Sequence, residues 1–240
     1  MKFGKLAKKT SYKTIKFKKY VLDGFAAPPP AFSTLDRVYK NLGISDPTVL
    51  FPMDGNDSLG DCSFASACHA STTWNGMVGV KHIPTDCDKE YLAFTGGQDN
   101  GCALLDVLNH WHNVGIAGSK ILGFAEIDSK NHDHVKLAIK EFGLVYSGFQ
   151  VPDNCMDQFN AGQAWTGGTL LNEGHAVSEP EYDENGLTNF TWGTTQKGTW
   201  GWWDECVDEC YCVIPRVALL NAFQGIDYAT MVNDLKLLAA

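Results

Sequence analysis

Two residues of this sequence have the chemistry and the order of a nucleophile and its base. Cys62 follows Gly60-Asp61 and begins an apolar, helix-like run. A helix N-terminus lowers a thiol pKa through its partial positive charge and its free N–H groups. His175 follows a glycine in "NEGHAV", at the start of a β-like run. A cysteine followed about a hundred residues later by a histidine is the order of a Cys-His site assembled across two lobes. On spacing alone, two unrelated residues are the better interpretation.

The elements that would position these residues follow from hydrophobic spacing. Residues 62 to about 77 are predicted to form a helix, because apolar and small side chains recur at intervals of three and four and Gly76 ends the run. Residues 103–113 and 132–143 have the pattern of two more helices. After Gly143 come short β-like runs divided by turns, and residues 226–240 resemble a closing helix. Helices followed by a strand-rich half indicate an α+β fold with two lobes.

The segment around Cys62, "NDSLGDCSFASA", resembles the nucleophile segment of papain-like cysteine peptidases. In that family a glutamine lies six residues before the cysteine, and a small, apolar helix follows it. Asn56 occupies that place here, although asparagine is one methylene shorter. The resemblance implies that the Asn56 amide and the Cys62 backbone N–H form the oxyanion hole.

The resemblance continues in order along the chain, over roughly residues 48–215. "NGCALLDVLNHWHNVGI" is similar to the family's glycine-cysteine segment and helix, and "EGHAVSEPEYDENGLTNFTWG" to its catalytic histidine strand and the following Trp-Gly strand. The family's "CGSCW" is absent, but ordered motifs are stronger evidence than any one of them. The resemblance is to a divergent, phage or bacterial type of member. It implies a papain-like two-lobed fold, with a helical left lobe and an antiparallel, β-barrel-like right lobe.

One departure concerns the residue that would orient His175. In the family an asparagine two residues before the tryptophan holds the histidine tautomer, and that place here is Phe190. Asn189 is our tentative orienting residue, although on an ideal strand it faces the other way and only a bulge would turn it inward. Thr191 offers a hydroxyl, but it is two residues from Asn189 and would face the same side of an ideal strand. The sequence therefore does not decide which residue orients His175. Asp61 would raise the thiol pKa unless it points away.

Charge is unevenly distributed along the 240 residues. The net charge is -9, but residues 1–20 hold eight lysines and no acid, so the other 220 residues carry 11 basic and 28 acidic side chains. A basic arm of this kind docks on something acidic, which could be this body, a neighbouring copy or nucleic acid. Nucleic acid is the weakest candidate, because the body is itself acidic.

We divide the chain into a basic arm with a Pro-rich linker, residues 1–47, and a papain-like domain, residues 48–240, that starts near residues 46–51. The domain would comprise a helical lobe at about 48–130, a β-rich lobe at about 131–215 and the C-terminal helix at about 226–240. The sequence has neither the apolar core of a signal peptide nor a window approaching the ~18 apolar residues of a membrane span. We therefore expect cytoplasmic synthesis and no membrane partner.

The eight cysteines are expected to be reduced thiols, as is usual without a signal peptide. Three of them lie close together near Asp204 and Asp208 and could suggest a metal site; they are Cys206, Cys210 and Cys212. The second CxxC pair of a zinc site is missing, so we favour the interpretation that these cysteines are part of an apolar core. We predict neither a metal nor a cofactor. The tryptophans at 192, 200, 202 and 203 are expected to wall the site and the β-lobe core.

Two functions from different classes remain. The first is a papain-like cysteine peptidase, or a related acyl hydrolase, that acts on a peptide or protein substrate with Cys62, His175 and Asn56. The arm and linker would then be a short propeptide, although they lack a helical hairpin pattern. The second is a catalytically weak or silent papain-fold module that assembles into a homo-oligomer or a phage particle through its basic arm.

Overall fold

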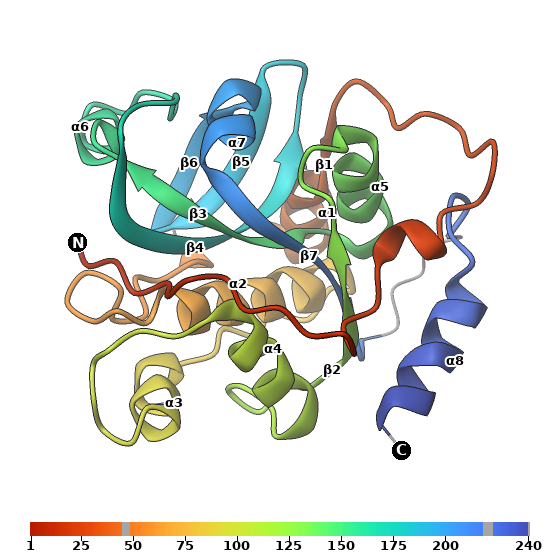
Figure 1. The fold of residues 1–240 in the computed structure, drawn as a ribbon, viewed down its shortest axis with the longest axis horizontal. Coiled ribbons are helices and arrows are strands. Elements are labelled where there is room, and N and C mark those ends of the chain that lie inside the picture. The colour runs from red at the N-terminus through yellow and green to blue at the C-terminus, as the bar shows by residue number, and fades with distance from the viewer. Residues whose placement is uncertain (45–48, 218–222, 240) are drawn as a thin grey trace.

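The computed structural model describes residues 1–44, 49–217 and 223–239. It is a mixed α and β structure, shown in Figure 1. Its helices are η1 (Phe17–Lys19), α1 (Thr34–Leu42), α2 (Cys62–Met77), α3 (Cys87–Phe94), α4 (Leu104–Asn113), α5 (His132–Phe142), α6 (Cys155–Asn160), α7 (Trp200–Cys206) and α8 (Tyr228–Ala239). Its strands are β1 (Phe32–Ser33), β2 (Ile121–Ile127), β3 (Val145–Pro152), β4 (Leu170–Tyr182), β5 (Gly186–Thr191), β6 (Thr194–Thr199) and β7 (Val207–Pro215).

The strands form one antiparallel sheet of seven strands in the order β2-β7-β3-β4-β5-β6, with β1 paired to β4. The outer strands β2 and β6 do not pair in the described residues, so the expected barrel-like closure is corrected to an open sheet. Each outer edge instead takes an isolated bridge, Lys16 to Glu126 on β2 and Trp165 to Gly198 on β6. Each bridge pairs one position of the outer strand with a distant segment, so part of each edge is shielded without closure of the sheet.

Helix α2 is the central element of the helical half. It runs below the sheet in Figure 1, with α3 and α4 on its other side. Nearly every one of its residues is buried, as is typical of a helix that packs on all faces. Its ends are tied to the sheet half, because Tyr146 Oη donates to Ser63 O and Trp74 Nε1 donates to Phe142 O. The predicted helix over residues 62–77 is confirmed.

Other predicted elements also have counterparts. Helix α4 falls within residues 103–113, α5 within 132–143 with Gly143 as its left-handed C-cap, and α8 within 226–240. Strand β2 lies in the range 48–130 that we expected for the helical lobe, yet it pairs with β7 of the sheet. The predicted domain start near residues 46–51 falls partly on residues 45–48, which lie outside the described residues.

The basic N-terminal arm lies on the body of the same chain. In Figure 1 it follows the boundary between the sheet and the helices α2 and α4. Phe17 and Tyr20 are buried in the core of the sheet half. Arm lysines pair with carboxylates of the body, namely Lys2 with Asp99, Lys8 and Lys16 with Glu126, Lys9 with Asp106, and Lys19 with Asp234. These arm lysines are therefore paired with acidic side chains of the arm's own chain.

Cysteine chemistry differs from the expectation in one place. Cys68 of α2 and Cys87 at the start of α3 form a disulfide, with their Cα atoms 6.6 Å apart. The expectation of reduced thiols is therefore wrong for this pair, because α3 folds back beside α2 and brings together two residues 19 apart in sequence. The other cysteines are free and buried: Cys62, Cys102, Cys155, Cys206, Cys210 and Cys212.

Two further observations concern metals and membranes. Cys206, Cys210 and Cys212 lie in the hydrophobic core of the sheet half. Within residues 1–44, 49–217 and 223–239, no group of three or more His, Cys, Asp or Glu side chains is arranged to hold a metal ion. A search of the same described residues finds no helix with the length and apolarity needed to span a bilayer.

Candidate active site

Cys62 and His175 lie on elements that face each other. Cys62 is the first residue of α2, and His175 is in β4 opposite Phe149 of β3. The backbone N–H of Ala176, the residue after His175, is directed at the Cys62 thiol, as are the N–H groups of Gly4 and Ser63. The structure therefore places the two predicted residues on adjoining elements, Cys62 at the start of α2 and His175 in β4 next to Ala176.

The His175 ring is fixed on several sides. Its Nε2 lies 2.8 Å from Thr191 Oγ1, and its plane stacks on Trp192 at a centroid distance of 4.6 Å. The edges of Phe149 and of Phe3, an arm residue, also contact it. Its Nδ1 is buried and has no hydrogen-bond partner, so this ring nitrogen makes no hydrogen bond to the Cys62 thiol in the structure. Trp192 thus walls the site as predicted.

Asn189, the tentative orienting residue, does not reach His175. Its Nδ2 donates to Gln196 O at 2.9 Å, and the residue that contacts the ring is Thr191. Phe190 lies on the opposite face of the strand and stacks on Phe51 at 3.8 Å. The prediction for Asn189 is therefore wrong, and the side chain that contacts the His175 ring nitrogen is Thr191.

An irregularity in the β4–β5 pairing explains this outcome. Glu181 pairs with Thr188, and continuing that register would place Phe190 on the face of β4 that carries His175. A one-residue shift follows, and Phe190 instead pairs with Ser178. A one-residue slip exchanges the two faces of a strand. The shift thus turns Thr191 toward His175.

Asn56 is buried close to the start of α2. Its Nδ2 donates to Asp61 Oδ1 at 3.1 Å. This bond uses one of the two hydrogens of the Asn56 amide. The Cys62 N–H is in the first turn of α2, where backbone N–H groups have no acceptor within the helix. Both donors of the predicted oxyanion hole therefore lie at the same helix end.

Asp61 affects the thiol as expected from the sequence. Burial raises the pKa of the Asp61 carboxyl to about 7, while the bond from Asn56 acts in the opposite direction. Burial also raises the pKa of Cys62 to about 11, and the charge of Asp61 adds to this increase. Burial lowers the pKa of His175 to about 3. In this covered state both Cys62 and His175 are neutral at neutral pH.

The cover is the N-terminal arm, which lies as an extended peptide across the site. Cys102 N donates to Gly4 O at 2.8 Å, Leu6 N donates to Cys102 O at 3.0 Å, and Lys5 N donates to Gly174 O at 2.9 Å. Gly174 directly precedes His175. The arm is thus bound by its backbone to both halves of the molecule at once, beside Cys62. No feature of the sequence other than the lysine-rich composition of the arm indicated this contact.

Glycines make the close approach of the arm feasible. A methyl group on Gly4 would overlap the carbonyl oxygen of Gly60, and one on Gly101 would overlap the carbonyl oxygen of Gly4. A methyl group on Gly174 would meet the carbonyl oxygen of Lys5. A groove lined by glycines admits the backbone of another peptide, which is what the arm supplies here.

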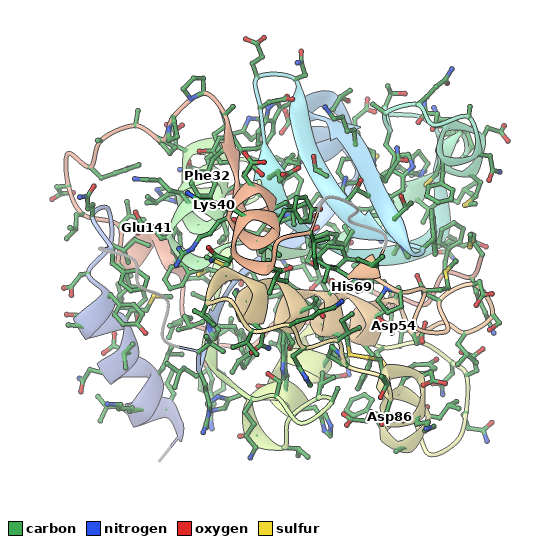
Figure 2. The ribbon with its side chains drawn as sticks, turned by 180° about the vertical axis from the view of Figure 1, so that it is seen from behind. Phe32, Lys40, Asp54, His69, Asp86 and Glu141 are labelled. Carbon is green, nitrogen blue, oxygen red and sulfur yellow. A yellow bond between two sulfur atoms is a disulfide. The ribbon has the colours of Figure 1, made fainter. Side chains whose placement is uncertain are left out.

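His69, a second histidine on α2, has a structural environment. It lies seven residues after Cys62, and Figure 2 shows it with Asp54 nearby. Its Nε2 is 2.9 Å from Pro52 O and 3.2 Å from Asp54 Oδ2, and its ring packs against Phe51 and Phe190. His69 therefore ties a loop to the helix and stands apart from the Cys62 site.

Comparison with known proteins identifies the fold. No family model matches the chain, and no curated protein matches it. Among solved structures, xylellain, a cysteine protease from Xylella fastidiosa, aligns with a TM-score of 0.68 and 14% identity over 90% of this chain and 96% of that chain. The structure of procathepsin B S9 from Trypanosoma congolense aligns with a TM-score of 0.61 and 10% identity, over 90% of this chain and 87% of its own.

The chain therefore has the two-lobed α+β fold of papain-like cysteine proteases. This confirms the fold expected from the resemblance, with the open sheet as the one correction.

Proposed function

We propose that this protein is a papain-like cysteine peptidase with Cys62 as nucleophile and His175 as base. One observation carries the proposal: a peptide, the chain's own arm, is bound in extended form by backbone hydrogen bonds beside these two residues. A groove that binds peptide backbone, with a thiol and an imidazole at its centre, supplies the binding and the reactive groups of acyl transfer from a peptide.

In the proposed reaction, the Cys62 sulfur attacks the carbonyl carbon of a peptide bond and its proton passes to His175 Nδ1. The carbonyl electrons move to oxygen, and the Cys62 N–H and the second Asn56 amide hydrogen stabilise this oxyanion. The C–N bond then breaks, and the amine leaves with the proton from His175. Water, deprotonated by His175, attacks the thioester, and the carboxylic acid leaves as the thiol is restored.

Thr191 would act as a positioning residue for His175. When its hydroxyl oxygen accepts the Nε2 hydrogen, Nδ1 is left with a lone pair for the thiol proton. A hydroxyl also donates, so Thr191 fixes the tautomer less strictly than a carboxamide oxygen, which only accepts. We therefore expect a working site whose rate is reduced relative to one with an asparagine at this place.

The arm would keep this peptidase inactive in the intact chain. The group that faces the Cys62 sulfur from the arm is the N–H of Gly4, which is a hydrogen-bond donor and not a carbonyl carbon. Covering the site also excludes water and keeps Cys62 and His175 neutral. The arm would thus be an inhibitory segment rather than a bound substrate, as the interpretation of residues 1–47 as a short propeptide requires.

Site-resolved labelling tests the proposal. A peptidyl vinyl sulfone is added at pH 7 to the Gly4→Ala variant, in which the arm cannot approach Gly60, and labelled cysteines are mapped by mass spectrometry. We expect modification of Cys62 and no labelling of Cys102, a nearby buried thiol. Labelling should be lost when His175→Ala is added. Slow and equal labelling of the six free cysteines would contradict the proposal.

The burial of both reactive groups in the intact chain also favours the second hypothesis, a silent module that assembles through its arm into oligomers or a virus particle. That hypothesis requires the arm lysines to leave their carboxylates on this body. Sedimentation of the intact chain separates the two: a concentration-independent monomer supports the peptidase proposal, and an assembly that dissociates when Lys8 and Lys16 are changed to Ser supports the module.

A further inference from the structure

The side chain of Lys5 in the arm enters a pocket in the sheet half, and its exposed fraction is 0%. Its Nζ lies 3.0 Å from each oxygen of Asp208 and 3.2 Å from Glu209 Oε1. It also donates to Leu6 O at 3.4 Å. A lysine is almost never fully buried unless it is paired, and here it is paired twice. The pocket therefore holds one cation between two carboxylates.

The pocket is formed by the sheet itself. Gly148 of β3 pairs with Glu209 of β7, and a methyl group on Gly148 would overlap the Lys5 stem. The missing side chain thus makes room for a long aliphatic stem. The carboxylates are held from behind, because Gln150 Nε2 donates to Asp208 Oδ2 and Tyr211 Oη donates to Glu209 Oε2, each at 3.0 Å. The pocket is therefore preorganised on strands rather than formed by the arm.

The acidic pocket needs a cation in order to keep its charge. The Glu209 side chain is fully buried, and burial raises the pKa of its carboxyl, while the charge of Lys5 acts in the opposite direction. A buried carboxylate that loses its partner is strongly destabilised. When the arm leaves the groove, another cationic side chain would restore the lost pairing.

We propose that Asp208, Glu209 and Gly148 form the specificity pocket of this groove, and that it takes a lysine side chain of a peptide substrate. The proposal rests on the proposed function, since it assigns the arm's place in the groove to substrates. Lys5 N donates to Gly174 O, directly before His175, so the pocket is reached from the backbone position beside the reactive groups. Lys5 would occupy the place of the substrate lysine.

Peptide binding tests the pocket without requiring catalysis. The full-length Cys62→Ala, Gly4→Ala, Lys5→Ala variant is titrated into fluorescent alanine pentapeptides that carry one central lysine, leucine or glutamate, and anisotropy gives each Kd. We expect the lysine peptide to bind at least about tenfold more tightly than the leucine peptide, as for other buried charge pairs. Adding Glu209→Gln should reduce that preference and leave the leucine Kd unchanged.

Matched variants keep the result specific. Asp106→Asn removes the same charge from an exposed pair outside the pocket and should leave the lysine preference intact. Should Glu209→Gln fail to fold by circular dichroism, Asp208→Asn, whose side chain is 30% exposed, should also reduce the preference. Equal Kd values for lysine and leucine peptides, or a preference that survives both changes, would overturn the pocket. If the lysine preference is intact but the vinyl sulfone does not label Cys62 in the Gly4→Ala variant, the pocket stands and the peptidase proposal is overturned.

Discussion

The two ends of the basic arm are held to the body by different forces. Residues 1–9 are bound mainly through backbone hydrogen bonds and lysine ion pairs, with Gly4 at the closest approach. Residues 15–21 instead place the aromatic rings of Phe17 and Tyr20 in the hydrophobic core of the sheet half. Hydrogen bonds and ion pairs can be replaced by contacts with water or with another peptide. Water cannot replace the free energy that is lost when a buried aromatic ring leaves the core.

This difference assigns two roles to one segment. The later residues are part of the fold, and they tether the first nine residues close to the groove. The first residues cover Cys62, and their one aromatic ring before Tyr12, Phe3, is only partly buried against the core of the sheet half. A tethered cover of this kind rebinds readily because its effective concentration is high. Each prediction below separates the tether from the cover.

The largest effect is expected from the tether. Phe17→Ala should destabilise the fold by roughly 3–5 kcal/mol, since it removes a fully buried aromatic ring from the core. Urea unfolding followed by circular dichroism measures this change. Tyr12→Ala is the matched control in the same arm, because Tyr12 is 94% exposed and should have almost no effect. Equal stabilities for the two variants would show that residues 15–21 are not part of the core.

The cover should respond to Gly4→Ala without a comparable loss of stability. Releasing the arm rehydrates the site, so the pKa of Cys62 should fall from about 11, and thiolate should form at lower pH. A fall of about two units would raise the thiolate fraction at pH 7 roughly a hundredfold. The pH profile of iodoacetamide labelling at Cys62 measures this shift.

Gly24→Ala is the control for that measurement. A methyl group on Gly24 has no atom within 4 Å, and its φ of 69° makes the change a local backbone strain only. The labelling profile of this variant should match that of the intact chain. If the labelling profile of Gly4→Ala also matches that of the intact chain, the inhibitory role of the arm is contradicted.

A smaller effect is expected beneath the cover, at Thr191. In the Gly4→Ala background, Thr191→Val removes the hydrogen bond to His175 Nε2 while preserving the shape of the side chain. One hydrogen bond is worth about 1 kcal/mol, or roughly a fivefold loss in the rate of vinyl sulfone labelling. Thr191→Ser keeps the hydroxyl and should retain most of the rate. The positioning role would be refuted by a valine variant that is as fast as the serine variant.

The smallest effect should come from the exposed ion pairs of the arm. Lys9 pairs with Asp106, and both side chains are largely exposed at 57% and 40%. Such pairs contribute no more than about 1 kcal/mol and weaken in salt. Lys9→Ala should therefore change neither the urea midpoint nor the labelling rate at 150 mM salt by a measurable amount. A large effect would mean that charge, and not the backbone contacts of residues 4–6, holds the cover.

Much of the fold was accessible from the sequence. The α2 helix has the predicted bounds because its small and apolar residues recur at helical spacing. After Gly143 the predicted strands and closing helix have counterparts, whereas the short helices α6 and α7 were not predicted. The prediction that the sheet closes into a barrel was wrong. The residues that bridge to its outer strands, Lys16 and Trp165, come from segments distant in sequence, and local patterns do not indicate such contacts. The Cys68–Cys87 pairing depends on how α3 folds back, which spacing does not contain.

The site was less predictable than the fold. Cys62, His175 and Asn56 were proposed from motif order; Cys62 begins α2, Asn56 donates to Asp61 just before it, and His175 lies in β4. The position of Thr191 depends on a one-residue shift between β4 and β5, and no residue type signals that shift. The arm in the groove follows from tertiary contacts to Gly60, Gly101 and Gly174, which are far from it in sequence.

Peptide hydrolysis is the most direct test of the central claim, that Cys62 lies in a peptide-cleaving groove covered by the arm. A mixed library of lysine-containing peptides is incubated at pH 7 with the intact chain, with Gly4→Ala, and with Gly4→Ala combined with Cys62→Ala, and new termini are counted by mass spectrometry. The account predicts cleavage by Gly4→Ala, little by the intact chain and none without Cys62. Absence of cleavage by folded Gly4→Ala, or cleavage that persists after Cys62→Ala, would contradict it.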